Sequence, residues 1–193
     1  MRSASLGLMQ PPHLSLVTLP DQILRAPTAR VSFFDDELRQ LVASMRALMH
    51  AAEGVGLAAP QIGRSIKLAV IEYEPLESPD GAPDKQPAIS FLALANPTIT
   101  QLGKTYEVYD EGCLSVPDLQ TPIPRATEIS ILADNLDGQR IRIRAKGLLA
   151  RILQHEIDHL NGLLIVDRTI DRKIRKEYQS MPEISKIKNQ ILK

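Results

Sequence analysis

The sequence lacks the features that mark a secreted protein. Cys113 is its only cysteine, so no disulfide can form within the chain. The first twenty residues hold no long apolar run, because the stretch from 14 to 19 is short and follows Pro-Pro-His. The first twenty residues contain no acidic residue, as in a transit peptide, but they contain only one arginine. We therefore expect a cytoplasmic protein.

An excess of charge of either sign is also missing. The 23 lysines and arginines balance the 23 aspartates and glutamates, so the chain as a whole has no field that would favour DNA or a membrane surface. Residues 168–193 are the exception, with eight basic and three acidic residues and a net charge of +5. We expect a basic C-terminal helix there, either as a contact with the ribosome or as a solvated helix face.

No break in composition divides the 193 residues, which predicts one domain, with residues 1–19 as a flexible start. Helical periodicity appears at 35–52 and 147–161, whereas the Gly- and Pro-rich stretch 54–61 predicts no regular element. Strands are expected at 66–73, 92–100, 104–109, 128–133 and 140–145. This order favours an α+β fold: mixed and antiparallel strands around a central helix, with a further N-terminal and C-terminal helix.

The central helix carries a His-Glu-any-any-His motif at His155, Glu156 and His159. This spacing places both imidazoles on one side of a helix, where they can bind one metal ion, with Glu156 beside them to take a proton from water. The alternative is a helix with two hydrogen-bonded histidines and an exposed glutamate. Leu148 and Ile152 continue the stripe of His155 and His159, so the histidines point inward and need partners.

A catalytic zinc-type site needs a third protein ligand. His13 lies in an N-terminal segment without a clear structural pattern, and His50 lies near the end of the first predicted helix. Cys113 is therefore the better candidate. Gly112 lets the backbone approach closely, and a thiolate binds zinc or ferrous iron strongly. The alternative for a lone cysteine is a small buried apolar residue.

Three strings together resemble the signature motifs of the peptide deformylases. They are Gly-Val-Gly-Leu-Ala-Ala-Pro-Gln at 54–61, Glu-Gly-Cys-Leu-Ser at 111–115 and Gln-His-Glu-Ile-Asp-His-Leu-Asn-Gly at 154–162. The resemblance runs from about residue 20 to about residue 167. It implies a hydrolase that removes formate from N-formyl-methionyl nascent peptides. It also implies that Cys113, His155 and His159 bind the metal and that Glu156 is the acid and base.

The resemblance also implies how the substrate binds. The side-chain amide of Gln61 and the backbone N–H of Leu114 would stabilise the oxyanion. The candidates for binding the methionine side chain and the peptide backbone are Val55, Gly56, Gly112, Leu148 and Ile152. For the apolar members of this set, core packing is the ordinary alternative.

Charged residues near the motifs are candidates to orient the metal ligands. Glu111, Arg125 and Asp158 stand at suitable positions, although each would also be ordinary as a solvated surface charge. Some family members carry an arginine seven residues after the ligand cysteine, where this chain has Gln120. This departure bears on substrate affinity and leaves the chemistry unchanged.

Two other functions are also compatible with the sequence. A zincin-type metallopeptidase would use the same histidines with a downstream glutamate as third ligand, and Glu177 and Glu183 are available. A metal-holding module associated with the ribosome would need no base, which Glu156 argues against. The ligand set suits either Fe²⁺ or Zn²⁺.

Overall fold

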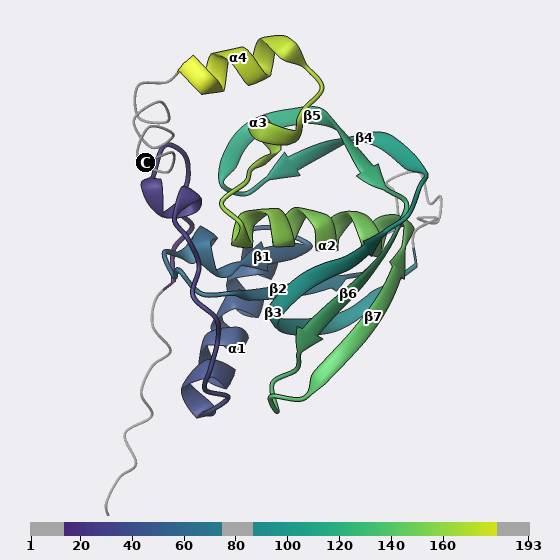
Figure 1. The fold of residues 1–193 in the computed structure, drawn as a ribbon. Coiled ribbons are helices and arrows are strands. Elements are labelled where there is room, and N and C mark those ends of the chain that lie inside the picture. Colours follow the sequence, from purple (N-terminus) through teal and green to yellow (C-terminus); the bar gives the residue numbers. More distant parts are fainter. Residues whose placement is uncertain (1–13, 75–86, 181–193) are drawn as a thin grey trace, which may run out of the picture.

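The computed structural model describes residues 14–74 and 87–180 (Figure 1). Five strands form an antiparallel sheet in the order β1-β2-β3-β6-β7, and two more form an antiparallel hairpin, β4-β5. The strands of the larger sheet are β1 Gly56–Ala58, β2 Leu68–Tyr73, β3 Ile89–Leu102, β6 Glu128–Asp134 and β7 Arg140–Lys146. The hairpin consists of β4 Tyr106–Cys113 and β5 Val116–Ala126. The fold is therefore α+β with antiparallel sheets.

Helix α2, Gly147–Leu160, lies between the five-stranded sheet and the β4-β5 hairpin (Figure 1). Its apolar side chains, among them Leu153 and Ile157, are buried against residues of β3 and β6. Helix α1, Asp36–Ala51, packs on β1 and β2. The side chain of Asp35 caps α1 by accepting a hydrogen bond from the backbone N–H of Leu38. Both long helices thus occupy the ranges that their apolar periodicity predicts.

The stretch 54–61 is more regular than its glycines and proline indicate. It contains β1 and then the 3₁₀ turn η2, Ala59–Ile62. Strand β1 pairs with β2, with Leu57 opposite Val70, and its last two residues are fully buried. The prediction of an irregular loop here was wrong, because a three-residue strand is too short to show a period.

The C-terminal region is also divided differently from the prediction. Helix α3, Ile165–Arg168, ends where the basic helix was expected to begin, and α4, Arg172–Ser180, follows after a break. Asp171 caps the start of α4, since its carboxylate accepts the backbone N–H groups of Lys173 and Ile174. No side chain of α4 is buried. Residues 181–193 and residues 1–13 of the predicted flexible start lie outside the described residues.

A further 3₁₀ turn, η1 at Gln22–Arg25, connects the start of the described chain to α3 through Arg25, which pairs with Asp167. Among the described residues, no helix has the length and apolar character needed to span a membrane.

Candidate metal and active site

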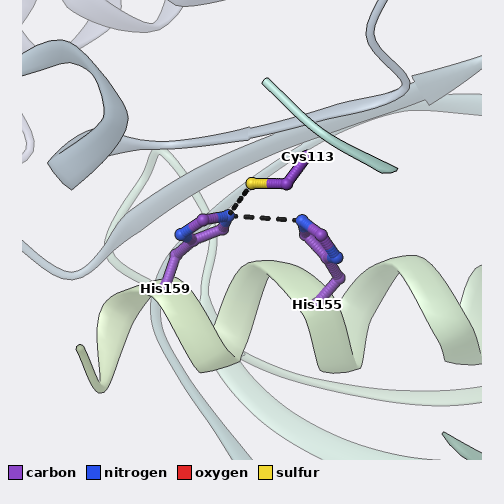
Figure 2. A group of neighbouring side chains, drawn as sticks. All are labelled: Cys113, His155 and His159. Carbon is purple, nitrogen blue, oxygen red and sulfur yellow. Dashed lines mark hydrogen bonds between the residues drawn. The ribbon is translucent and has the colours of Figure 1, made fainter. Parts of the chain in front are cut away.

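Three side chains from two elements converge on one point (Figure 2). His155 and His159 project from the same face of α2, one turn apart, and their Nε2 atoms lie 3.2 Å from each other. The Sγ atom of Cys113, at the end of β4, lies 3.3 Å from Nε2 of His159. The ligand atoms of the three residues all lie within 4.8 Å of one another. This spacing is that of a set of donors around a single ion.

The β4-β5 turn brings the sulfur to the histidines. Cys113 ends β4 and faces Val116, the first residue of β5, across the turn. Its side chain is partly exposed and points at the imidazoles instead of into a dry core. Among the residues that the structure describes, these three are the group of His, Cys, Asp and Glu side chains able to hold a metal ion.

The other candidate ligands lie elsewhere. Nε2 of His50, on α1, is 2.7 Å from a carboxylate oxygen of Glu72, and His50 is not part of the cluster. Glu177, on the exposed helix α4, is not part of the cluster. Glu183 and His13 lie outside the described residues.

Charged residues surround the two histidines behind the ligand atoms. Nδ1 of His155 lies 3.1 Å from a carboxylate oxygen of Glu111 on β4. Arg125 on β5 donates two hydrogen bonds to Glu111, of 3.0 and 2.9 Å, and a third to Asp158 on α2. Both carboxylates are buried, so they are parts of the site and not solvated surface charges.

Glu111 stays ionised despite its burial. Burial alone would raise its pKa, but the hydrogen bonds from His155 and Arg125 and the charge of Arg125 hold the pKa at about 2. An ionised carboxylate on Nδ1 fixes the imidazole of His155 with its Nε2 toward the ligand cluster.

The two imidazoles differ in their pKa in the absence of metal. Burial would lower the pKa of His155, but its hydrogen bonds to Cys113 and Glu111 and the charge of Glu156 raise it well above its usual value. Burial and the charge of His155 instead lower the pKa of His159. In the metal-free site a proton is therefore favoured on His155 over His159.

Glu156 lies within this site with one oxygen free. Its side chain is 3% exposed, and among the described residues its Oε2 has no hydrogen-bond partner. Burial raises its pKa to about 7, in spite of the opposing charge of His155. A carboxylate with such a pKa can both accept and return a proton near neutral pH.

The side chain of Gln61, on η2, is held by a hydrogen bond from the backbone of a nearby residue. Its Oε1 accepts the backbone N–H of Ala58 at 2.8 Å, and this fixes the amide so that its Nε2 lies 3.9 Å from Sγ of Cys113. The side chain is 1% exposed. The donor end of the amide therefore faces the ligand cluster.

These groups open into a cavity of about 690 Å³. Its lining includes the predicted substrate residues Val55, Gly56, Gly112, Leu148 and Ile152. It also includes Gln61, Leu114, Glu156 and the ligands Cys113 and His155. His159, Arg125 and Asp158 are buried behind this surface. The structure thus gathers the residues from three distant stretches of sequence around one space.

Comparison with known proteins decides the family. The sequence model of the polypeptide deformylase family matches residues 13–175 of this chain. The chain is 40% identical over 166 residues to the peptide deformylase of a Picosynechococcus strain, covering 86% of this chain and 84% of that relative. The chain belongs to the polypeptide deformylase family.

Solved structures agree with this membership. A Synechococcus elongatus peptide deformylase in complex with actinonin is 41% identical, with a TM-score of 0.74, and the match covers 92% of this chain and 90% of that one. A class I type b peptide deformylase from Acinetobacter baumannii, with Met-Ala-Ser bound, is 33% identical, with a TM-score of 0.74. That match covers 80% of this chain and 97% of the other. The predicted peptide deformylase is confirmed, and the matches do not favour a zincin or a module without catalysis.

Two arginines at this deformylase site carry no sequence signal. Arg151 lines the cavity and donates a 2.8 Å hydrogen bond to Glu111, and Arg168 donates two to Asp158. Neither lies in a motif, although Arg151 precedes His155 by one helical turn. Gln120, which stands where some family members have arginine, also lines the cavity.

Proposed function

We propose that this chain hydrolyses the formamide of N-formyl-methionyl nascent peptides, which releases formate and leaves a free amino terminus. The observation that carries the proposal is the position of Glu156, buried in the same cavity as the Cys113 and His155 donors and with an unpaired oxygen. The Acinetobacter relative with Met-Ala-Ser bound supports this substrate class, since such a tripeptide has the methionine terminus that deformylation produces.

The residues fit a divalent metal ion, which we take to be Fe²⁺ or Zn²⁺. Cys113, His155 and His159 would supply one sulfur and two nitrogens, a set that both metals accept, and would leave a position open. Such an ion, when bound, polarises a carbonyl group and makes water more acidic. Replacing Cys113 by Ser should weaken binding of either metal, and measured binding of Fe²⁺ and of Zn²⁺ to the purified protein tests the assignment.

Glu156 moves the proton in this proposal. Its free Oε2 accepts a proton from the water that attacks the formyl carbon, and the same carboxyl group then delivers it to the leaving nitrogen. Burial raises the pKa of this carboxyl group to about 7 in the metal-free site, which makes it a stronger base, and a bound cation would lower the pKa again.

Gln61 and Leu114 stabilise the oxyanion that develops on the formyl oxygen. The amide of Gln61 is already oriented by its hydrogen bond from Ala58, so it needs no reorganisation during the reaction. Leu114 follows the ligand Cys113 and lines the cavity, which suits its backbone N–H as a second donor.

The cavity receives the methionine side chain and the start of the peptide. Val55, Leu148 and Ile152 supply an apolar lining for a flexible thioether side chain. The backbone near Gly56 and Gly112 lies on the same surface and would pair with the extended peptide as an added strand does. Pairing through the backbone would tolerate many sequences after the methionine.

Helix α2 is the central element of the site in this account, because it carries two ligands and the base. Glu111 orients His155, and Arg125 joins Glu111 to Asp158, so the strands of the hairpin are fixed to the helix. We treat residues 1–193 as a single metallohydrolase domain that works in the cytoplasm, where new polypeptides appear.

The basic C-terminal region would bring the enzyme to its substrate. Helix α4 exposes Arg172, Lys173 and Lys176, and no residue of α4 is buried in the domain. We propose that this surface contacts ribosomal RNA. Co-sedimentation with ribosomes should then fall steeply as salt is raised, and association that is absent or independent of salt would refute the contact.

The substitution Glu156→Gln tests the catalytic proposal. It keeps the shape of the side chain but removes the base, so we expect metal content to be retained and formate release from a formyl-Met tripeptide to be lost. Glu128→Gln, at an exposed ion pair with Lys146, is the matched control and should behave as the unsubstituted enzyme. Preserved turnover in Glu156→Gln would remove the assigned role.

A further inference from the structure

Arg151 joins three elements around the ligand cluster. It lies on α2, and its Nη1 donates hydrogen bonds to Oε1 of Glu111, at 2.8 Å, and to the backbone oxygen of Ile123 on β5, at 3.2 Å. Its Nη2 donates to the backbone oxygen of Glu107 on β4, at 3.0 Å. The guanidinium also lies over the ring of Tyr109, 4.8 Å from its centre.

Arg151 and His155 bind the same carboxylate from the same face of α2. They are four residues apart, so their side chains lie one turn from each other. Glu111 accepts Arg151 on one oxygen and contacts His155 Nδ1 with the other. The position of Glu111, and with it the orientation of His155, therefore depends on Arg151 as well as on Arg125.

The same contacts set the distance between the two parts of the ligand set. Cys113 comes from the end of β4 and the histidines come from α2, so the ligand geometry depends on how the strand sits on the helix. Arg125 ties β5 to α2 at Asp158, close to His159. Arg151 ties both strands to α2 before His155, and it is the one of these two arginines that lines the cavity.

We infer that Arg151 is a positioning residue of the metal site, which holds the β4-β5 hairpin on α2 so that the Cys113 thiolate and the two imidazoles meet at one ion. The inference rests on the proposed metal site. It assigns to Arg151 no contact with the reacting atoms.

The test uses the protein loaded with Co²⁺, because the thiolate-to-Co²⁺ charge-transfer band in the absorption spectrum reports the bond between the metal and Cys113. In Arg151→Met we expect a weakened or shifted thiolate band and a loss of Co²⁺ to a chelator about tenfold faster than in the unsubstituted protein. The kcat for formyl-Met peptides should fall more than KM changes. Arg151→Lys keeps the charge but cannot reach the three oxygens together, so it should give intermediate values and serves if the methionine variant does not fold.

Arg46→Met is the matched control, because Arg46 makes the same kinds of contact away from the site. It donates two hydrogen bonds of 2.6 Å to the buried Glu72 and lies 4.5 Å from the ring centre of Phe91. This variant should lose stability but keep the thiolate band and the rate of metal loss. Unchanged spectra and metal loss in the Arg151 variants, or equal changes in Arg46→Met, would overturn the inference. Absence of formate release by the unsubstituted protein would instead refute the proposed function, because the metal readouts do not depend on turnover.

Discussion

Gly56 and Glu156 are packed so closely that the glycine has no room for a side chain. A Cβ atom added to Gly56 would lie 2.2 Å from Oε1 and 2.8 Å from Cδ of Glu156. Strand β1 therefore holds the carboxyl group of Glu156 in place. Because Glu156 is the proposed base and not a proposed ligand, substitutions at Gly56 separate the effects of proton transfer from those of metal binding.

Gly56→Ala should accordingly displace Glu156 and leave the metal bound. A misplacement of about 1 Å can cost about a hundredfold in rate, and we expect a fall in kcat of that order. Gly103→Ala is the steric control outside the site, since its added methyl group would lie 3.0 Å from the backbone oxygen of Glu128, and it should keep kcat even if it lowers stability. Metal analysis and steady-state kinetics on the two variants provide the check, and a normal kcat in Gly56→Ala would contradict the packing argument.

The rate should fall in acid as Glu156 becomes protonated. Its pKa of about 7 in the metal-free site is raised by burial, and a bound cation will lower it, so we expect the acid limb of kcat/KM to lie below pH 7. Below this pKa the base is neutral, and kcat/KM should drop about tenfold per pH unit. A profile without an acid limb down to pH 4, below the usual glutamate pKa of 4.5, in protein shown to be folded and metal-loaded would exclude Glu156 as the base.

Metal binding should release a proton from His155. The hydrogen bonds to Cys113 and Glu111 raise its pKa well above the usual value when no metal is present, which favours the protonated ring, and this proton must leave before His155 can act as a ligand. Calorimetry of metal binding in buffers of different ionisation enthalpy measures the protons released. Affinity should rise with pH through the neutral range, and binding without proton release would be inconsistent with His155 as a ligand.

Glu111 should make the metal-free fold sensitive to acid. Its pKa falls from 4.5 to about 2 on folding, so its contribution is complete above pH 4.5 and is lost as the pH falls toward 2. This shift corresponds to about 3 kcal/mol of unfolding free energy. In Glu111→Gln that part of the pH dependence should disappear, whereas Glu128→Gln should retain it. Denaturant unfolding at pH 5 and pH 3 measures the difference. An equal loss of unfolding free energy between these pH values in the unsubstituted protein, Glu111→Gln and Glu128→Gln would contradict an ionised, buried Glu111.

The sequence predicted the long elements because they carry strong periods. The apolar stripe of α1 and the strands β6 and β7 across a turn appear where their patterns place them. Strand β5 was missed because Pro117, Pro122 and Pro124 argue against a strand, yet all three are tolerated in a hairpin that pairs only with β4. The break at Asp171 was missed because a cap within a basic run gives little signal.

The candidate site was predictable from motifs to the extent that chemistry limits residue choice. Histidines one turn apart and a glutamate beside them need no fold to be noticed, and the same holds for the cysteine string once the family resemblance is used. The place where Cys113 meets His159 depends on the register of the β4-β5 hairpin over α2, which no local pattern specifies. Arg151 was missed for the same reason, since an arginine on a helix is ordinary until its partners on two strands are known.

The most direct test of the account is a titration of the metal-free protein, kept without air, with Fe²⁺ or Zn²⁺, in which formate release from a formyl-Met tripeptide and bound metal are measured on the same samples. We expect formate release to rise in proportion to bound metal and to saturate at about one ion per chain, as a single site of three ligands requires. In Cys113→Ser the same titration should show weaker binding. Formate release by the metal-free protein, or full metal binding without any release, would contradict the account.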